Sequence, residues 1–263
     1  MLTLYKQEMK NNLKSLLIWT LSVGGMCFAC ILLFSGLEES MADIADSMAQ
    51  MGAFSQAFGM TQLSIATITG FYAAEIGTIH ALGGAMFAAM TGAIMLSKEE
   101  EGHTSEFLYA LPITRTKATG AKYMALLSNI FFFNMLCVLI YEVGFRILGE
   151  GIETGDFLFY HLMQLLMHVE IGTLCFLISS FVRKNKIGAG IAVALLFYVL
   201  DLMGRVLPDL EDFMFLSPFS FANASDIFSG TDWDGMALGF GMVLTVISLV
   251  AAFGVYQKKD LAS

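Results

Sequence analysis

Long apolar segments alternate with short polar connections along most of the chain. An α-helix needs about 20 residues to cross the roughly 30 Å hydrocarbon core of a bilayer. Six apolar segments reach that length, and they cover residues 15–35, 72–96, 123–147, 158–182, 187–206 and 236–256. The pattern predicts an all-α integral membrane protein, with residues 1–263 forming a single transmembrane domain of six spanning helices.

Three further segments have a pattern that favours structure outside the hydrocarbon core. Residues 1–14 place apolar side chains at helical spacing opposite a row of lysines, which predicts an N-terminal amphipathic helix lying at the membrane interface. Residues 38–60 repeat methionine and phenylalanine at spacings of three and four, which predicts an external amphipathic helix. Residues 207–234 contain two prolines and several acids, and we expect a structured outer loop there.

Composition supports a membrane protein. Hydrophobic residues make up 57% of the chain and charged residues 14%, whereas soluble domains average about 45–50% and about 25%. Such a chain has too few charges to cover a soluble surface. The net charge of −9 also excludes a general nucleic-acid binder, which would be basic.

The distribution of charge predicts the orientation. Cytoplasmic connections of membrane proteins are enriched in lysine and arginine. One side of the predicted topology holds 12 of the 14 basic residues, whereas the opposite connections hold Arg146 and Arg205 together with most of the acids. Both termini are therefore expected in the cytoplasm. The basic residues on that side are Lys6, Lys10, Lys14, Lys98, Arg115, Lys117, Lys122, Arg183, Lys184, Lys186, Lys258 and Lys259.

The cytoplasmic connection at 97–122 combines charge with a short apolar helix. It opens with Lys98 and three glutamates, and Gly102 then interrupts the run. Thr104 can begin a new helix, which must end before Pro112, since the residue preceding a proline is disfavoured in the helical region. An apolar helix held close to the membrane in this way is a candidate docking element for a soluble partner. An ordinary connecting loop is the alternative.

The same connection carries a recognisable motif, E-E-G-x-T-x-E-F-L-x-x-L-P-I-T-R. Its defining positions are Glu100, Glu101, Gly102, Thr104, Glu106, Phe107, Leu108, Leu111, Pro112 and Arg115. This pattern resembles the loop after the second span of ABC-2 type permeases, the membrane subunits of bacterial ATP-binding-cassette exporters. His103 is an extra residue relative to many members. The basic N-terminal arm and the closing Lys258–Leu261 segment are also similar to that family.

The resemblance implies a division of labour between subunits. Two copies of a separate ATPase would bind ATP and Mg, and this chain would form the translocation path in a bacterial-type plasma membrane with a second permease copy or homologue. The connection at 97–122 would then contain the coupling helix. The chain is not expected to be an enzyme, because its sequence contains no phosphate-binding G-x-x-x-x-G-K-[ST] loop.

Ionisable residues inside spans are candidate functional residues. Glu170 lies near the middle of the fourth span, with His168 on a different face of that helix. Glu75 and His80 fall toward the outer end of the second span, where we expect exposure to the interface. Two further pairs are spaced to form ion pairs along one helix, or else to line an outer vestibule: Glu142 with Arg146, and Asp201 with Arg205.

Other functions stay open at this stage. An ATP-independent secondary carrier could use Glu170 as a proton site, and a non-transporting immunity or sensor protein could have the same topology. An intramembrane enzyme is disfavoured, because neither H-E-x-x-H nor G-x-S-x-G occurs. The four cysteines all lie in apolar segments, so we expect packing residues there and no metal site.

Overall fold

The computed structural model describes residues 1–110, 112–231, 233 and 235–260. Leu111, Asp232 and Asp234 therefore lie outside the described residues. Within them the chain is helical and contains no strand, which confirms the predicted all-α class. Six helical segments are long and apolar enough to cross a membrane: α1 (Leu2–Ala49), α3–η1–α4 (Ile68–Phe71, Tyr72–Ile76 and Gly77–Ile94), α7 (Arg115–Leu148), α8 (Thr154–Phe181), α9 (Ile187–Val206) and α13 (Gly235–Lys258).

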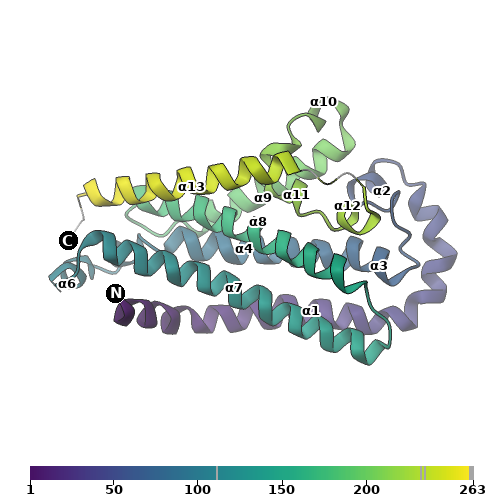
Figure 1. The fold of residues 1–263 in the computed structure, drawn as a ribbon, viewed down its shortest axis with the longest axis horizontal. Coiled ribbons are helices and arrows are strands. Elements are labelled where there is room, and N and C mark those ends of the chain that lie inside the picture. The colour runs from purple at the N-terminus through teal and green to yellow at the C-terminus, as the bar shows by residue number, and fades with distance from the viewer. Residues whose placement is uncertain (111, 232, 234, 261–263) are drawn as a thin grey trace.

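The six segments form one elongated bundle (Figure 1). The α1 helix packs along α7, the α4 helix contacts α8, α9, α1 and α7, and α13 lies against α8. Both chain ends lie at the same end of the bundle, together with the short helices α5 (Lys98–Glu101) and α6 (Ser105–Ala110). The opposite end holds α2 (Ala53–Ala57), α10 (Pro208–Glu211), η2 (Met214–Leu216), α11 (Pro218–Phe221) and α12 (Ala224–Ser229).

Small residues let α4 occupy the centre of the bundle. A Cβ atom added at Gly92 would lie 2.3 Å from the carbonyl oxygen of Gly172 on α8, and one at Gly190 on α9 would lie 2.8 Å from the carbonyl oxygen of Ala89. Backbones can approach this closely only where side chains are absent or very small. The glycines in these spans therefore serve close helix packing.

The first helix differs from the sequence expectation. Residues 1–14 were expected to form a separate interfacial helix and 38–60 an external one, but Leu2–Ala49 is a single helix of 48 residues. At 1.5 Å per residue it is about 72 Å long, more than twice the hydrocarbon thickness. The sequence has no proline in this stretch to interrupt it. Residues 38–60 do not form one helix as expected. The long helix ends at Ala49, Gly52 has a φ of 60°, and a separate short helix begins after it.

Candidate functional site

The candidate coupling segment is a turn between two short helices. Four residues after α4, the chain forms α5, and Gly102 and His103 then reverse its direction before α6 begins. His103, the extra residue in the motif, adopts a left-handed φ of 51°. The backbone amide of Thr104 donates to the carbonyl oxygen of Glu99 at 2.8 Å and closes the turn. The α5 and α6 helices thus form a compact hairpin at the end of the bundle that holds both termini.

Three consecutive glutamates on α5 contact three different parts of the chain. Glu99 forms an ion pair with Lys122 on α7. The Oε1 atom of Glu100 accepts from the ammonium of Lys259, just after α13, at 2.5 Å. An oxygen of Glu101 accepts from the backbone amide of Asn185, between α8 and α9, at 3.1 Å. Because successive side chains on a helix point in different directions, one turn of α5 ties these elements together.

A buried group of charges continues this network to α1. Glu8 is 2% exposed and pairs with Lys98 on α5 and with Lys122, whose Nζ lies 2.8 Å from Glu8 Oε1. Lys122 is fully buried and also donates to the carbonyl oxygen of Met95 at 3.0 Å. We refer to Glu8, Lys98, Glu99, Glu100, Lys122 and Lys259 as the inner-end charge network.

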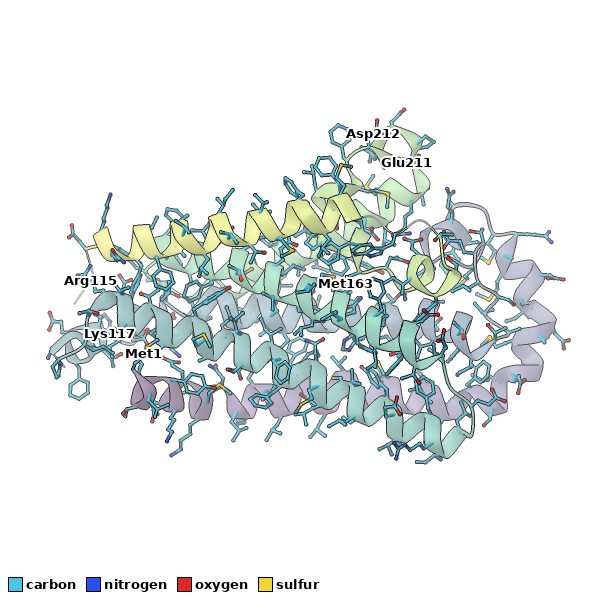
Figure 2. The ribbon with its side chains drawn as sticks, viewed as in Figure 1. Met1, Arg115, Lys117, Met163, Glu211 and Asp212 are labelled. Atoms are coloured by element: carbon cyan, nitrogen blue, oxygen red, sulfur yellow. The ribbon has the colours of Figure 1, made fainter. Side chains whose placement is uncertain are left out.

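Arg115 extends the contacts to the end of α13. Its guanidinium donates to the carbonyl oxygens of Lys259 at 2.6 Å and Gln257 at 3.2 Å. Figure 2 shows Arg115 and Lys117 close to Met1 at this end of the molecule. Arg115 therefore fastens the start of α7 to the end of α13.

The predicted coupling residues divide into anchored and exposed groups. Glu100 is buried and Arg115 half-buried, and both bind other parts of the chain, whereas Glu106 and Phe107 on α6 are exposed, Phe107 by 75%. Beside α6 lies an apolar groove of 380 Å³, and its lining includes Met1, Leu4, Phe107, Leu108 and Ile113. Gly102, Thr104 and Pro112 are exposed as well, and Leu111 lies outside the described residues. A soluble partner can thus reach α6, while α5 is fixed to the bundle.

Glu170 lies at membrane depth between α8 and α13. Its side chain is 3% exposed and faces Gly241, and it borders a groove lined mainly by apolar residues. No charged or hydrogen-bonding neighbour acts on it within the described part of the chain. The carboxyl is therefore buried without a partner among the described residues, which is uncommon for an acidic side chain.

His168 belongs to a separate polar cluster, which sequence reasoning missed. Its Nδ1 lies 3.1 Å from Asn134 Oδ1, and the same oxygen lies 3.2 Å from Nε2 of His80. His161 completes the cluster, with its ring centroid 5.0 Å from that of His80 and its Nε2 atom 2.8 Å from the hydroxyl of Tyr72. The expectation that His80 is exposed was wrong, because it is fully buried, whereas Glu75 is exposed. The contributing residues come from α4, η1, α7 and α8. The spacing of residues within any one of these elements therefore does not predict the cluster.

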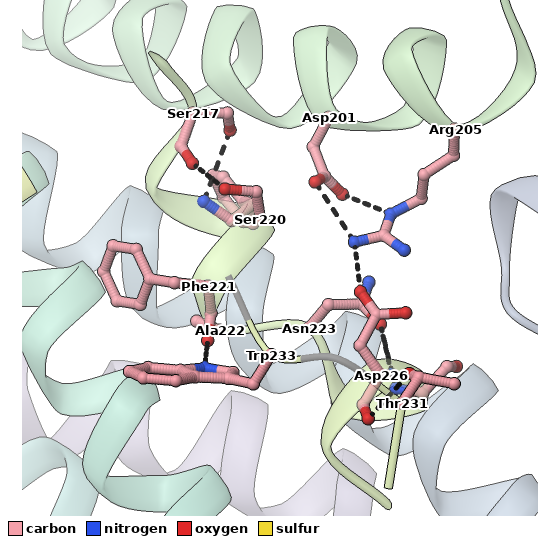
Figure 3. Close-up of polar contacts among 12 residues, drawn as sticks. Asp201, Arg205, Ser217, Ser220, Phe221, Ala222, Asn223, Asp226, Thr231 and Trp233 are labelled. Atoms are coloured by element: carbon pink, nitrogen blue, oxygen red, sulfur yellow. Dashed lines mark hydrogen bonds and ion pairs between the residues drawn. The ribbon is translucent and has the colours of Figure 1, made fainter. Parts of the chain in front are cut away.

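The two predicted helical ion pairs have different outcomes. Asp201 accepts from Arg205 at 3.0 Å as expected, and Arg205 also donates to Asp226 on α12 at 2.9 Å (Figure 3). Glu142 and Arg146 form no ion pair within 4.0 Å in the described residues, and the Arg146 side chain is exposed. An exposed pair of this kind gains little in water. The bridge from α9 to α12 through Asp226 is a contact that helical spacing alone does not predict.

The comparisons with known proteins agree with the helical architecture. A search of curated proteins returned no match. The family model described as ABC-2 family transporter protein matches residues 2–261, which is nearly the entire chain. This match and the six apolar helices identify a membrane component of a transport system: the chain belongs to the ABC-2 transporter family.

Proposed function

We propose that this chain is the transmembrane permease subunit of an ATP-driven exporter. A second permease copy or homologue would complete the translocation path, and two ATPase subunits would bind ATP and Mg. The observation that supports this proposal best is the contrast within the α5–α6 hairpin. The α6 helix exposes Glu106 and Phe107 to solvent, whereas α5 is held by buried ion pairs.

In the proposed mechanism, ATP binding draws the two ATPase subunits together and displaces α6. The hairpin does not move alone, because Glu99 and Glu100 are joined to Lys122 on α7 and to Lys259 after α13. Glu8 adds α1 to the same unit. Displacement of α6 would therefore shift the inner ends of several spans together and change which side of the path is open. The ATPase acts by binding one of two conformations more tightly.

The proposed orientation places the inner-end charge network in the cytoplasm of a bacterial-type cell and the chain in its plasma membrane. Lysine and arginine are concentrated at the end of the bundle that holds α6 and both termini. That distribution is typical of the cytoplasmic side, where ATP is available. The same orientation exposes α10 and α12 to the cell exterior.

The test is copurification of the tagged chain from its host membrane. We expect a Walker-motif ATPase to copurify with the wild type and to be lost from Phe107→Ala and Glu106→Lys. Phe213→Ala is the matched control, since Phe213 is 51% exposed and follows α10 at the opposite end. Melting temperatures in detergent should be unchanged in all three variants, because these side chains are exposed.

Two outcomes would overturn the proposal. In the first, Phe107→Ala and Glu106→Lys retain both the ATPase and transport, and α6 is then not a docking element. In the second, the purified chain alone transports substrate in liposomes under a pH gradient and Glu170→Gln abolishes that activity. The chain would then be a secondary carrier.

A further inference from the structure

The carboxyl of Glu170 lies deep in the bundle. It is 11 residues before the end of α8 at Phe181, or about 16 Å along the helix axis at 1.5 Å per residue. Its side chain is 3% exposed. An unpaired carboxylate at such a depth carries a large free-energy cost. A cationic partner would lower that cost.

The described residues do not supply a cationic partner for Glu170. No lysine, arginine or histidine forms an ion pair with Glu170 in the described residues. The nearby His168 points to Asn134 and Ala81 instead. Two buried basic side chains of the spans are engaged elsewhere, because Lys122 binds Glu8 and Arg205 binds Asp201. Any cation that pairs with the Glu170 carboxylate would therefore come from outside the described residues.

The neighbouring helix lacks a side chain where the carboxyl packs against it. A Cβ atom at Gly241 on α13 would lie 2.2 Å from Oε2 of Glu170 and 2.9 Å from its carboxyl carbon. Two residues earlier on the same helix, a Cβ atom at Gly239 would meet nothing within 4 Å. Space at position 241 thus serves the Glu170 carboxyl specifically.

Both Glu170 and Gly241 line a groove of 170 Å³ between α8 and α13. This volume is similar to that of an engineered apolar cavity in another protein, about 150 Å³, which binds benzene. The groove is lined by Leu166, Val169, Glu170, Phe221, Leu238, Gly241, Met242, Thr245 and Val246. Met242 and Val246 are 57% and 60% exposed on the surface of the bundle. The groove is therefore open to the surroundings of the bundle.

We propose that this groove binds a lipophilic ammonium ion, with Glu170 as its carboxylate partner. The apolar walls would hold the body of the ligand, and the ammonium would donate to the Glu170 oxygens beside Gly241. If the proposed transport function is correct, lipophilic ammonium ions are a substrate class of the exporter, and only this part of the proposal rests on that function. Binding itself requires no ATPase.

The test measures binding to the full chain in lipid nanodiscs without ATPase. The probes are radiolabelled 4-phenylbutylamine and 4-phenylbutan-1-ol, which share a skeleton and differ in the charged group. We expect saturable binding of the amine and only non-saturable partition of the alcohol. Because a hydrogen bond to a charged group contributes about 1.5–3 kcal/mol, Glu170→Gln should weaken amine binding roughly 10- to 100-fold.

Two glycine variants separate this site from a general effect on folding. Gly241→Ala should weaken amine binding, because its methyl group would displace the Glu170 carboxyl, whereas Gly239→Ala should bind like the wild type. Equal binding of amine and alcohol, or unchanged amine binding in Glu170→Gln, would overturn the proposal. Equal losses in Gly239→Ala and Gly241→Ala would also overturn it. Any of these results leaves ATPase docking at Phe107 intact, so the two proposals fail separately.

Discussion

Lys122 places its ammonium nitrogen 2.8 Å from Oε1 of Glu8, although 114 positions separate these residues in the chain. Neither side chain is more than 2% exposed. The pair joins the first turns of α1 to those of α7, and Glu99 on α5 contacts the same ammonium. Buried ion pairs therefore hold the candidate coupling hairpin against α1 and α7. Removal of a single charge should destabilise this contact.

Lys122→Met is expected to destabilise the protein strongly. The substitution leaves Glu8 and Glu99 without their shared cation, and breaking a buried ion pair from one side costs about 3–5 kcal/mol. We expect the melting temperature in detergent to fall by at least about 5 °C. Lys117→Met, an exposed position on the same helix, should change it little.

A double variant tests whether the charges act as a pair. Glu8→Gln removes one of the carboxylates that Lys122→Met leaves unpaired, so Lys122→Met with Glu8→Gln should be less destabilised than the sum of the two single variants. A strictly additive double variant would show that the two side chains do not stabilise each other.

The sequence predicted six apolar spans and a short helix between Gly102 and Pro112 for physical reasons that operate locally. A run of about 20 apolar residues is long enough to form a membrane-spanning helix regardless of its neighbours. Gly102 and Pro112 likewise restrict the length of α6 through their own backbone preferences. The His80–His161–His168 cluster depends on how α4 and α8 pack, and neither helix alone contains that information. The length of α1 was missed for a related reason, since amphipathic and apolar segments look different although no residue between them breaks the helix.

Cysteine labelling should establish the orientation of the bundle. Glu106 on α6 and Glu211 on α10 are exposed at opposite ends of the molecule; Figure 2 labels Glu211 beside Asp212. We expect a membrane-impermeant maleimide to label Glu211→Cys in intact cells and to label Glu106→Cys only after the membrane is opened. The wild type gives the background, since Cys27, Cys137 and Cys175 are buried and Cys30 is partly buried. The reverse labelling pattern would place α6 outside the cell.

Arg205→Met should loosen the outer end of the bundle. The guanidinium is shared by Asp201 and Asp226, and its side chain is only 8% exposed. Without it, the 3%-exposed Asp201 loses its cation, and α12 loses a contact with α9. We expect a loss of about 3 kcal/mol and faster proteolysis around residue 226. Arg146→Met is the control, and an equal effect of the two variants would show that the bridge contributes nothing.

Gly84→Ala should disrupt the histidine cluster. The added methyl would lie 2.2 Å from Cε1 and 2.4 Å from Nε2 of His168, whose ring is fixed by Asn134 and the carbonyl oxygen of Ala81. To relieve this contact, the ring must give up its hydrogen bonds or α4 and α8 must separate. Overpacking of this kind costs about 1–3 kcal/mol. Gly254→Ala on α13 meets nothing within 4 Å and should leave stability unchanged or slightly raised, because alanine favours a helix more than glycine does. The measurement is the melting temperature of each variant in the same detergent, and a Gly84→Ala variant as stable as Gly254→Ala would contradict the tight packing of α4 against His168.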